Sequence, residues 1–199
     1  MKILLAAPSR DLLQSYQKLL SEDFGETVTV FDGTQLLRLL AEGDYSLAIL
    51  DRSLPRVRHE LLLRQLRQEN VPVITLLPEP LSVRHLTEEP LANFFLPYPF
   101  QPETICRLIR DLIEKRQSGE VLPFANTALE TAAFRLRGGC ALTGAEIDVL
   151  TRLLTRGPVS PENNGVLVSA LNHKFQRNAV RARIQYATGK GFQLVTDDE

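Results

Sequence analysis

The stretch "LAILDRSLPR", residues 47–56, joins an apolar run of strand length to an acidic residue and a Leu-Pro pair. Consecutive apolar residues bounded by turn-forming residues are typical of a strand that is buried on both faces. Asp51 therefore stands at the C-terminal end of a predicted strand. A carboxyl group in that place either performs chemistry or accepts local backbone hydrogen bonds at the strand end, and we favour the second interpretation.

The rest of the first half repeats the alternation of strand and helix around this stretch. Proline residues interrupt the segment 78–91, so a helix there is predicted to be weak. Five β/α pairs with short connections predict an α/β fold, a flavodoxin-like doubly wound sheet of five parallel strands. The predicted strands are 2–7, 27–31, 46–51, 72–77 and 93–97, and the predicted helices are 10–22, 33–43, 59–70 and 101–116.

Charge divides the chain into two parts. Residues 1–118 carry 14 basic and 16 acidic side chains, whereas residues 121–194 carry 9 basic and 4 acidic ones. The polar stretch 114–123 between them contains Ser-Gly and is typical of a short linker. We predict a first domain over 1–116, a linker over 117–122 and a basic second domain over 123–196. The apolar runs are too short for a signal peptide or a membrane span, which predicts a soluble, cytoplasmic protein.

Residues 1–116 resemble the receiver domain of two-component response regulators. The resemblance is carried by "KILLAAPSRDLLQSYQKLL" from residue 2, "LAILDRSLP" from residue 47, "VPVITLL" from residue 71 and "FFLPYPFQPE" from residue 94. It implies that Asp51 occupies the position of the phosphoryl acceptor, at the carboxyl edge of the sheet.

The chain departs from the receiver pattern at every other position of the phosphorylation site. Ala7 and Pro8 stand where receivers have Mg²⁺-binding acids, Leu77 where they have Thr or Ser, and Tyr98 where they have Lys. Phosphoryl transfer depends on neutralising charge, and Mg²⁺ needs oxygen ligands. We therefore predict that Asp51 is a vestigial phosphoacceptor in a degenerate site, with no metal and no cofactor.

The second half has a different pattern. Short alternating segments precede "LTGAE" at 142–146, which predicts a helix with Thr143 as N-cap and Glu146 completing a capping box. The stretch "GKGF" at 189–192 separates two strand-like segments and predicts a hairpin. In this order the two motifs resemble the winged-helix DNA-binding domain of OmpR/PhoB-type regulators, a small α+β domain.

The region 163–183 is too short for the two helices that this family has between "LTGAE" and the hairpin. Either 165–177 is a recognition helix and the support helix is missing, or 165–174 is the support helix and 177–184 a short recognition helix. A solvated basic face without a ligand is the plain alternative to DNA binding. The predicted DNA-binding residues are the same in both registrations: Asn172, Lys174, Arg177, Arg181, Arg183 and Lys190.

The leading hypothesis is a transcriptional regulator of the response-regulator type that binds double-stranded DNA without control by aspartyl phosphorylation. The alternative is a protein–protein adaptor that has lost DNA binding. A phosphorylatable regulator or another enzyme ranks last, because no catalytic triad, metal cluster, P-loop or dinucleotide motif is present. The resemblance also implies a homodimer through the receiver half, at a face that includes Phe94, Phe95 and Ile109.

Overall fold

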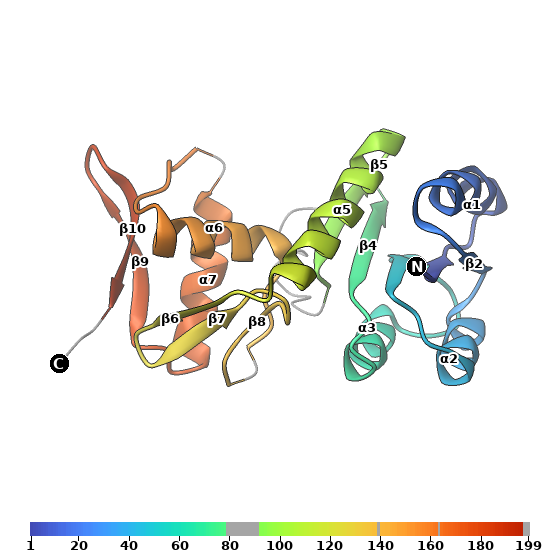
Figure 1. The fold of residues 1–199 in the computed structure, drawn as a ribbon, viewed down its shortest axis with the longest axis horizontal. Helices are drawn as coiled ribbons and strands as arrows, with labels where there is room; N and C mark the ends of the chain where they lie inside the picture. Colours follow the sequence, from blue (N-terminus) through green and yellow to red (C-terminus); the bar gives the residue numbers. More distant parts are fainter. Residues whose placement is uncertain (79–91, 139, 163, 197–199) are drawn as a thin grey trace. The chain divides into compact units, whose positions relative to one another are not determined.

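A computed structural model describes residues 1–78, 92–138, 140–162 and 164–196. Its contacts divide the chain into two compact units, Met1–Asp111 and Leu112–Glu199. The division falls within helix α5 (Pro102–Ser118), coloured light green in Figure 1. The domain boundaries at 116 and 123 stay a prediction.

The first unit is built on one parallel sheet with the strand order β2-β1-β3-β4-β5. This confirms the predicted five-stranded flavodoxin-like sheet, in which β2 pairs with one side of β1, and β3, β4 and β5 follow on the other side. The predicted fourth helix lies outside the described residues. The strands are β1 (Ile3–Ala6), β2 (Thr27–Val30), β3 (Leu47–Asp51), β4 (Val73–Pro78) and β5 (Phe94–Tyr98).

Helices flank this sheet, and polar side chains fix where two of them begin. The Ser9 hydroxyl accepts a hydrogen bond from the Leu12 amide at 3.3 Å, and Asp32 Oδ1 accepts one from the Gln35 amide at 2.9 Å. Each of these bonds satisfies an amide that has no partner within its own helix. These two helices are α1 (Arg10–Phe24) and α2 (Gly33–Glu42), and α3 (His59–Gln68) follows them.

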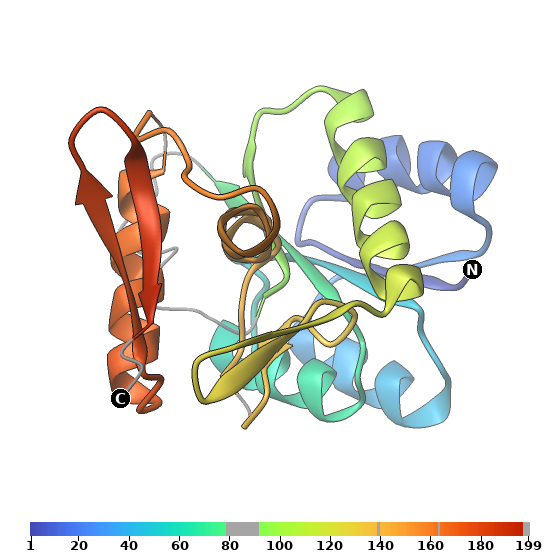
Figure 2. The same cartoon turned by 60° about the vertical axis from the view of Figure 1, so that its left-hand side comes forward.

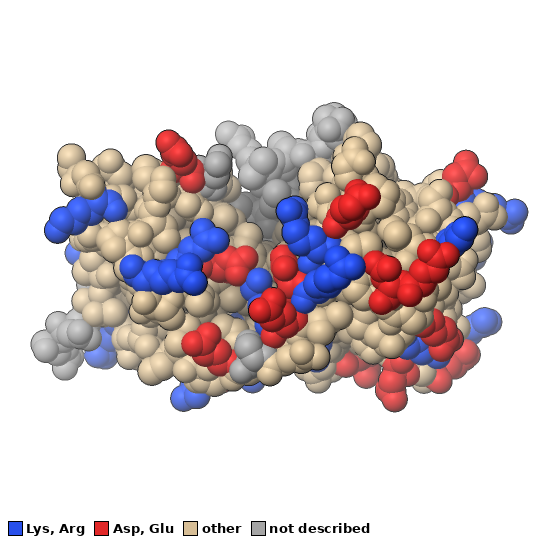
Figure 3. All heavy atoms as spheres, turned by 45° about the horizontal axis from the view of Figure 1, so that its top comes forward, with Lys and Arg blue, Asp and Glu red and all other residues tan. Residues whose placement is uncertain are grey.

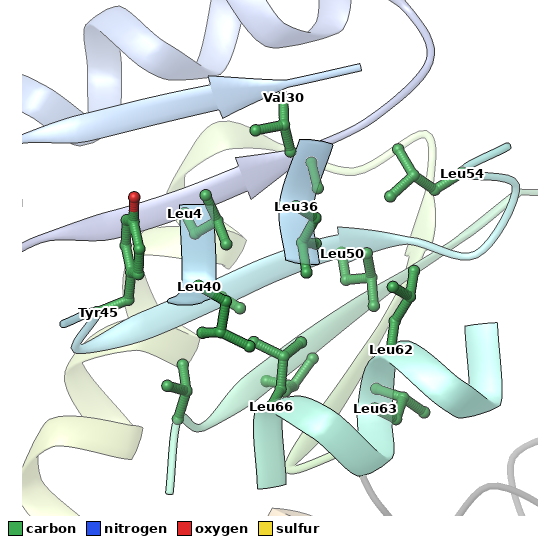
Figure 4. Close-up of a cluster of buried hydrophobic side chains, with 14 of the residues drawn as sticks. Leu4, Val30, Leu36, Leu40, Tyr45, Leu50, Leu54, Leu62, Leu63 and Leu66 are labelled. Atoms are coloured by element: carbon green, nitrogen blue, oxygen red, sulfur yellow. The ribbon is translucent and has the colours of Figure 1, made fainter. Parts of the chain in front are cut away.

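The core of the first unit explains why its strands read as apolar runs. Leu50 of β3 is fully buried, and Figure 4 shows it among Leu36 of α2 and Leu62 and Leu66 of α3. A strand covered on both faces needs apolar residues at successive positions, as the stretch 47–50 has.

Two residues of the expected dimer face belong instead to the interior. Ile109 is fully buried and Phe94 is 8 % exposed, so neither side chain can lie on an interface with another copy. The prediction that they form part of a dimer face is wrong, because the apolar stripe of α5 that contains Ile109 packs inside the unit. Phe95 is half-buried.

The second unit begins with a three-stranded antiparallel sheet of β6 (Val121–Phe124), β7 (Thr127–Glu130) and β8 (Arg135–Leu136). Helix α6 (Gly144–Thr155) follows and opens with the predicted capping box, which is confirmed. The Thr143 amide donates to Glu146 Oε2 at 2.7 Å, and the Glu146 amide donates to Thr143 Oγ1 at 3.3 Å.

One helix precedes the terminal hairpin. Within residues 164–196, α7 (Gly165–Arg177) is the only helix, and it is followed by β9 (Ala182–Ala187) and β10 (Gly191–Thr196). The helix bounds agree with the first of the two registrations, and a loop and a strand stand where the second placed a short helix over 177–184. The role of α7 as a recognition helix stays a prediction. Helix α7 lies alongside the β9–β10 hairpin in both views (Figure 1, Figure 2). No helix in the described part of the chain is long and apolar enough to cross a membrane.

Candidate functional site

Asp51 is closed in by its own neighbours. Its side chain is 1 % exposed. Oδ1 accepts hydrogen bonds from the Ser53 amide at 2.7 Å and from the Ser53 hydroxyl at 2.6 Å, and Oδ2 accepts one from the Tyr98 hydroxyl at 3.2 Å. These neutral donors satisfy the buried carboxylate, as a buried charge requires.

Tyr98 therefore reaches the acid from the end of β5. Burial, together with the charge of Asp51 and their hydrogen bond, raises the pKa of the Tyr98 phenol above its usual value. The phenol is thus a neutral donor at pH 7 and carries no positive charge with which to balance a phosphoryl group.

The remaining positions of the expected receiver site hold no charged groups. Ala7 is fully buried at the end of β1, and Leu77 is 3 % exposed in β4. Pro8 is exposed and continues the same edge. Among the residues that the structure describes, no group of three or more His, Cys, Asp or Glu side chains is placed to hold a metal ion.

A second polar pair, which the sequence analysis missed, lies near this edge. His59 begins α3, and its Nε2 is 3.4 Å from the hydroxyl of Thr75 in β4. Burial, and to a smaller extent the positive charge of Arg52, together lower the pKa of His59 to about 4. The only signal in the sequence was a hydroxyl at Thr75 inside an apolar run, which does not identify its partner.

Two of the six predicted DNA-binding residues have structural partners instead. Asn172 donates from Nδ2 to the Ile184 carbonyl and accepts from the Ile184 amide, both at 2.7 Å. Lys174 Nζ lies 2.6 Å from Glu146 Oε2, and both side chains are largely buried. These residues hold α7 to β9 and to α6, and their assignment as DNA contacts stays a prediction.

The other four predicted residues are exposed on the second unit. Arg177 is the last residue of α7, and Arg183 is in β9. Arg181 is exposed in the loop between them, and Lys190 is exposed in the hairpin turn. On the face shown in Figure 3, Lys and Arg side chains stand in separate groups, with Asp and Glu between some of them.

Polar side chains that could contact base edges lie on the same helix. His173 and Gln176 are exposed on α7, whereas Val168, Leu171 and Phe175 are buried. This alternation leaves one stripe of α7 facing solvent along its length. The stripe ends at Arg177, so hydrogen-bonding groups and positive charge are adjacent.

The fold and the position of Asp51 define a receiver-type first unit followed by a C-terminal unit. In sequence, the chain is 27% identical over 227 aligned residues to the transcriptional regulatory protein TctD of Salmonella typhimurium, covering 100% of this chain and 99% of that protein. No family model matches the chain.

Solved structures agree with this class. A mutant of RitR superposes with a TM-score of 0.68 at 18% identity, covering 98% of this chain and 99% of that chain. The signal receiver domain of an HD domain-containing protein from Pseudomonas fluorescens gives a TM-score of 0.53 at 26% identity, covering 59% of this chain and 97% of that domain. The chain is thus similar in sequence to a transcriptional regulatory protein, and in fold to a RitR mutant and to a receiver domain.

Proposed function

We propose that the chain is a DNA-binding transcriptional regulator of the response-regulator type that acts independently of aspartyl phosphorylation. In this proposal, residues 1–116 are a receiver-like domain, 117–122 a linker and 123–196 a winged-helix DNA-binding domain of OmpR/PhoB type. The observation that carries this proposal is the exposed positive charge at the end of α7 and on the β9–β10 hairpin that follows it in the chain.

The chemistry of this surface fits a nucleic-acid backbone. Arg177, Arg181 and Arg183 are close in the chain and exposed, and Lys190 is exposed at the hairpin turn. Guanidinium and ammonium groups neutralise phosphates, while His173 and Gln176 on α7 supply hydrogen-bonding groups for base edges. A helix followed by a hairpin is the arrangement that winged-helix domains present to DNA.

The proposed independence from phosphorylation rests on the surroundings of Asp51. An attacking carboxylate must be accessible, and the transferred phosphoryl group needs a cation beside it. Here three hydrogen bonds from Ser53 and Tyr98 occupy the Asp51 carboxylate, and its edge of the sheet has Ala7 and Pro8 in place of acids.

The test measures DNA binding and phosphorylation separately. Wild-type protein is titrated against a library of genomic fragments from its own source at graded salt concentrations, where phosphate contacts make affinity fall steeply with salt. The same preparation is incubated with acetyl phosphate and Mg²⁺ and analysed by mass spectrometry. We expect salt-dependent binding, no phosphate on Asp51, and equal DNA affinity for Asp51→Asn. Stoichiometric aspartyl phosphate would contradict the proposal.

A protein–protein adaptor is the second candidate. The engagement of Asn172 and Lys174 inside the unit favours it, because this leaves fewer side chains for DNA than the sequence indicated. Absence of DNA binding at low salt would support the adaptor.

We further propose a homodimer through the receiver-like domain, formed without a signal, since a site that does not accept phosphate cannot switch the pairing. Light scattering at tens of micromolar, roughly the range in which small interfaces still form, tests it. A monomer under those conditions would contradict it.

A further inference from the structure

The segment 178–183 runs from the end of α7 into the first two residues of β9, and it carries two of the exposed arginines. Its backbone is bonded at nearly every position. The Asn178 amide donates to the Lys174 carbonyl at 3.1 Å, and the Val180 amide donates to the Phe175 carbonyl at 2.9 Å. These bonds fold the start of the segment back on the last turn of α7.

A side chain from a distant element completes this bonding. Asn126, in the turn between β6 and β7, donates from Nδ2 to the Ala179 carbonyl at 2.9 Å. Its Oδ1 accepts from the Arg181 amide at 2.8 Å. A single carboxamide thus satisfies one donor and one acceptor of the segment, across 53 and 55 residues of chain.

The other end of the segment is held in the same way. Asn172 of α7 donates to the carbonyl and accepts from the amide of Ile184, on the side of β9 that faces away from β10. Strand edges have backbone groups that need partners, and this carboxamide supplies them. Two asparagines therefore hold the segment: Asn126 bonds its backbone at Ala179 and Arg181, and Asn172 bonds the backbone of Ile184, directly after Arg183.

The conformation that they hold is one the chain does not prefer. Ala179 has φ 50°, in the left-handed region, which costs a residue with a side chain about 1 kcal/mol or more. Such a conformation persists where surrounding bonds determine it. Beyond it, Ala182 and Ile184 are buried, so the alternation of the strand directs Arg181 and Arg183 outward on one face.

We infer that Asn126 and Asn172 are positioning residues, which hold 178–183 as a preformed arginine platform for the phosphates of one DNA strand. The inference rests on the proposed function for its ligand and on the two carboxamide clamps for its geometry. Without the clamp the segment can leave this conformation, so one of its arginines no longer reaches a phosphate; ordering the segment before binding therefore keeps that contact and removes the entropic cost of ordering it in the complex.

The first experiment tests the clamp without DNA. Amide hydrogen exchange is followed by NMR in the full chain. Asn126→Ala should speed exchange at the Arg181 amide by about tenfold, the effect of losing one ordinary hydrogen bond and the order it imposes. Asn126→Asp keeps the acceptor and should leave Arg181 protected. Unchanged exchange at Arg181 in Asn126→Ala would overturn the clamp.

The second experiment tests what the clamp does for binding. Asn126→Ala should weaken binding to a genomic fragment bound by the wild type and lower the salt slope by about one unit, as expected when one phosphate contact is no longer held. Thr127→Val is the matched control, because the neighbouring Thr127 hydroxyl bonds the Arg137 carbonyl at 2.9 Å and not the segment.

The outcomes separate the inference from the proposed function. Faster exchange with an unchanged salt slope would overturn the positioning role while leaving DNA binding intact. A wild type that binds no DNA at low salt would refute the proposed function and the phosphate platform together, and the exchange experiment would still decide the clamp. An equal loss of slope in Thr127→Val would show a general weakening of the unit and would overturn the specific role.

Discussion

The two units treat their buried carboxylates in opposite ways. In the first, Asp51 is held by neutral donors, the Ser53 amide and the hydroxyls of Ser53 and Tyr98. In the second, Glu146 is held by the capping box and by the ammonium group of Lys174. A carboxylate with neutral partners can lose one donor and keep others, whereas a buried ion pair that loses its cation leaves an uncompensated charge.

The two units also differ in which polar side chains they leave exposed to a ligand. The first unit directs Ser53 and Tyr98 toward Asp51, so the carboxylate at this edge of the sheet is enclosed by neutral side chains. The second unit directs Lys174 inward to hold its helices, and it leaves Arg177, Arg183 and Lys190 exposed.

Loss of the buried cation should have the largest effect. Lys174→Met removes the partner of Glu146 and should destabilise the second unit by about 3–5 kcal/mol, as for other buried pairs cut on one side. Native-state hydrogen exchange, read separately for the amides of β3 and β9, should show the loss in β9. Lys190→Met is the control, since that lysine is exposed, and it should change stability by less than about 0.5 kcal/mol. Equal effects from the two substitutions would contradict the ion pair.

Acid should destabilise the first unit next most strongly, through His59. Its pKa is about 4 in the folded chain, against 6.5 for the unperturbed side chain. The unfolded chain therefore binds the proton first as pH falls, so stability that is present above pH 6.5 is lost between about 6.5 and 4. The loss should approach about 3 kcal/mol at the bottom of this window.

The measurement is urea unfolding of the first unit across that pH range. His59→Gln should flatten the profile, because an amide has no titration in this window and can still reach the Thr75 hydroxyl. A profile in His59→Gln that runs parallel to that of the wild type would assign the acid sensitivity to other groups.

A pair of glycines tests the hairpin of the second unit. Gly191 has φ 91°, and a Cβ there would lie 2.4 Å from the Val159 carbonyl oxygen, where Val159 and Phe192 exchange backbone hydrogen bonds. Gly191→Ala should cost about 2–3 kcal/mol of stability, from the conformation and the clash together. Gly189 has φ 75° and no heavy atom within 4 Å of the added Cβ, so Gly189→Ala should cost only about 1 kcal/mol. Thermal unfolding of the two variants checks the order.

Local patterns were enough to predict much of this structure. The apolar run before Asp51 identified β3, and the spacing of Thr143 and Glu146 identified the start of α6, because both signals depend on residues within one element. The parallel sheet followed from the alternation of such elements. Lys174 shows where this reasoning ends: its charge and its position on a helix predicted a solvent-facing cation.

The partner of a side chain is set by how elements pack, and short-range spacing does not contain that information. Glu146 is 28 residues from Lys174, and Asn126 is 55 residues from Arg181. Asn172 was predicted to contact base edges for the same reason. The sequence around a carboxamide on a helix does not show whether that group faces DNA or a neighbouring strand. The loop over 178–181 was equally hidden, because Ala179 gives no signal of a left-handed conformation.

The smallest expected effect concerns the turn of the hairpin. Lys190→Ala should weaken binding to all DNA sequences about equally and lower the salt slope by about one unit, because the loss of one phosphate contact releases one fewer counterion. Lys190 is exposed beside Gly189 and Gly191, so its removal costs little stability. Arg137→Ala serves as the control, since Arg137 lies 3.4 Å from Glu130 Oε1 and precedes the turn of another sheet. Binding is measured by titration at four or more salt concentrations, on specific and unrelated fragments. A loss confined to one sequence would make Lys190 a base contact, and an unchanged slope would remove the hairpin turn from the proposed interface.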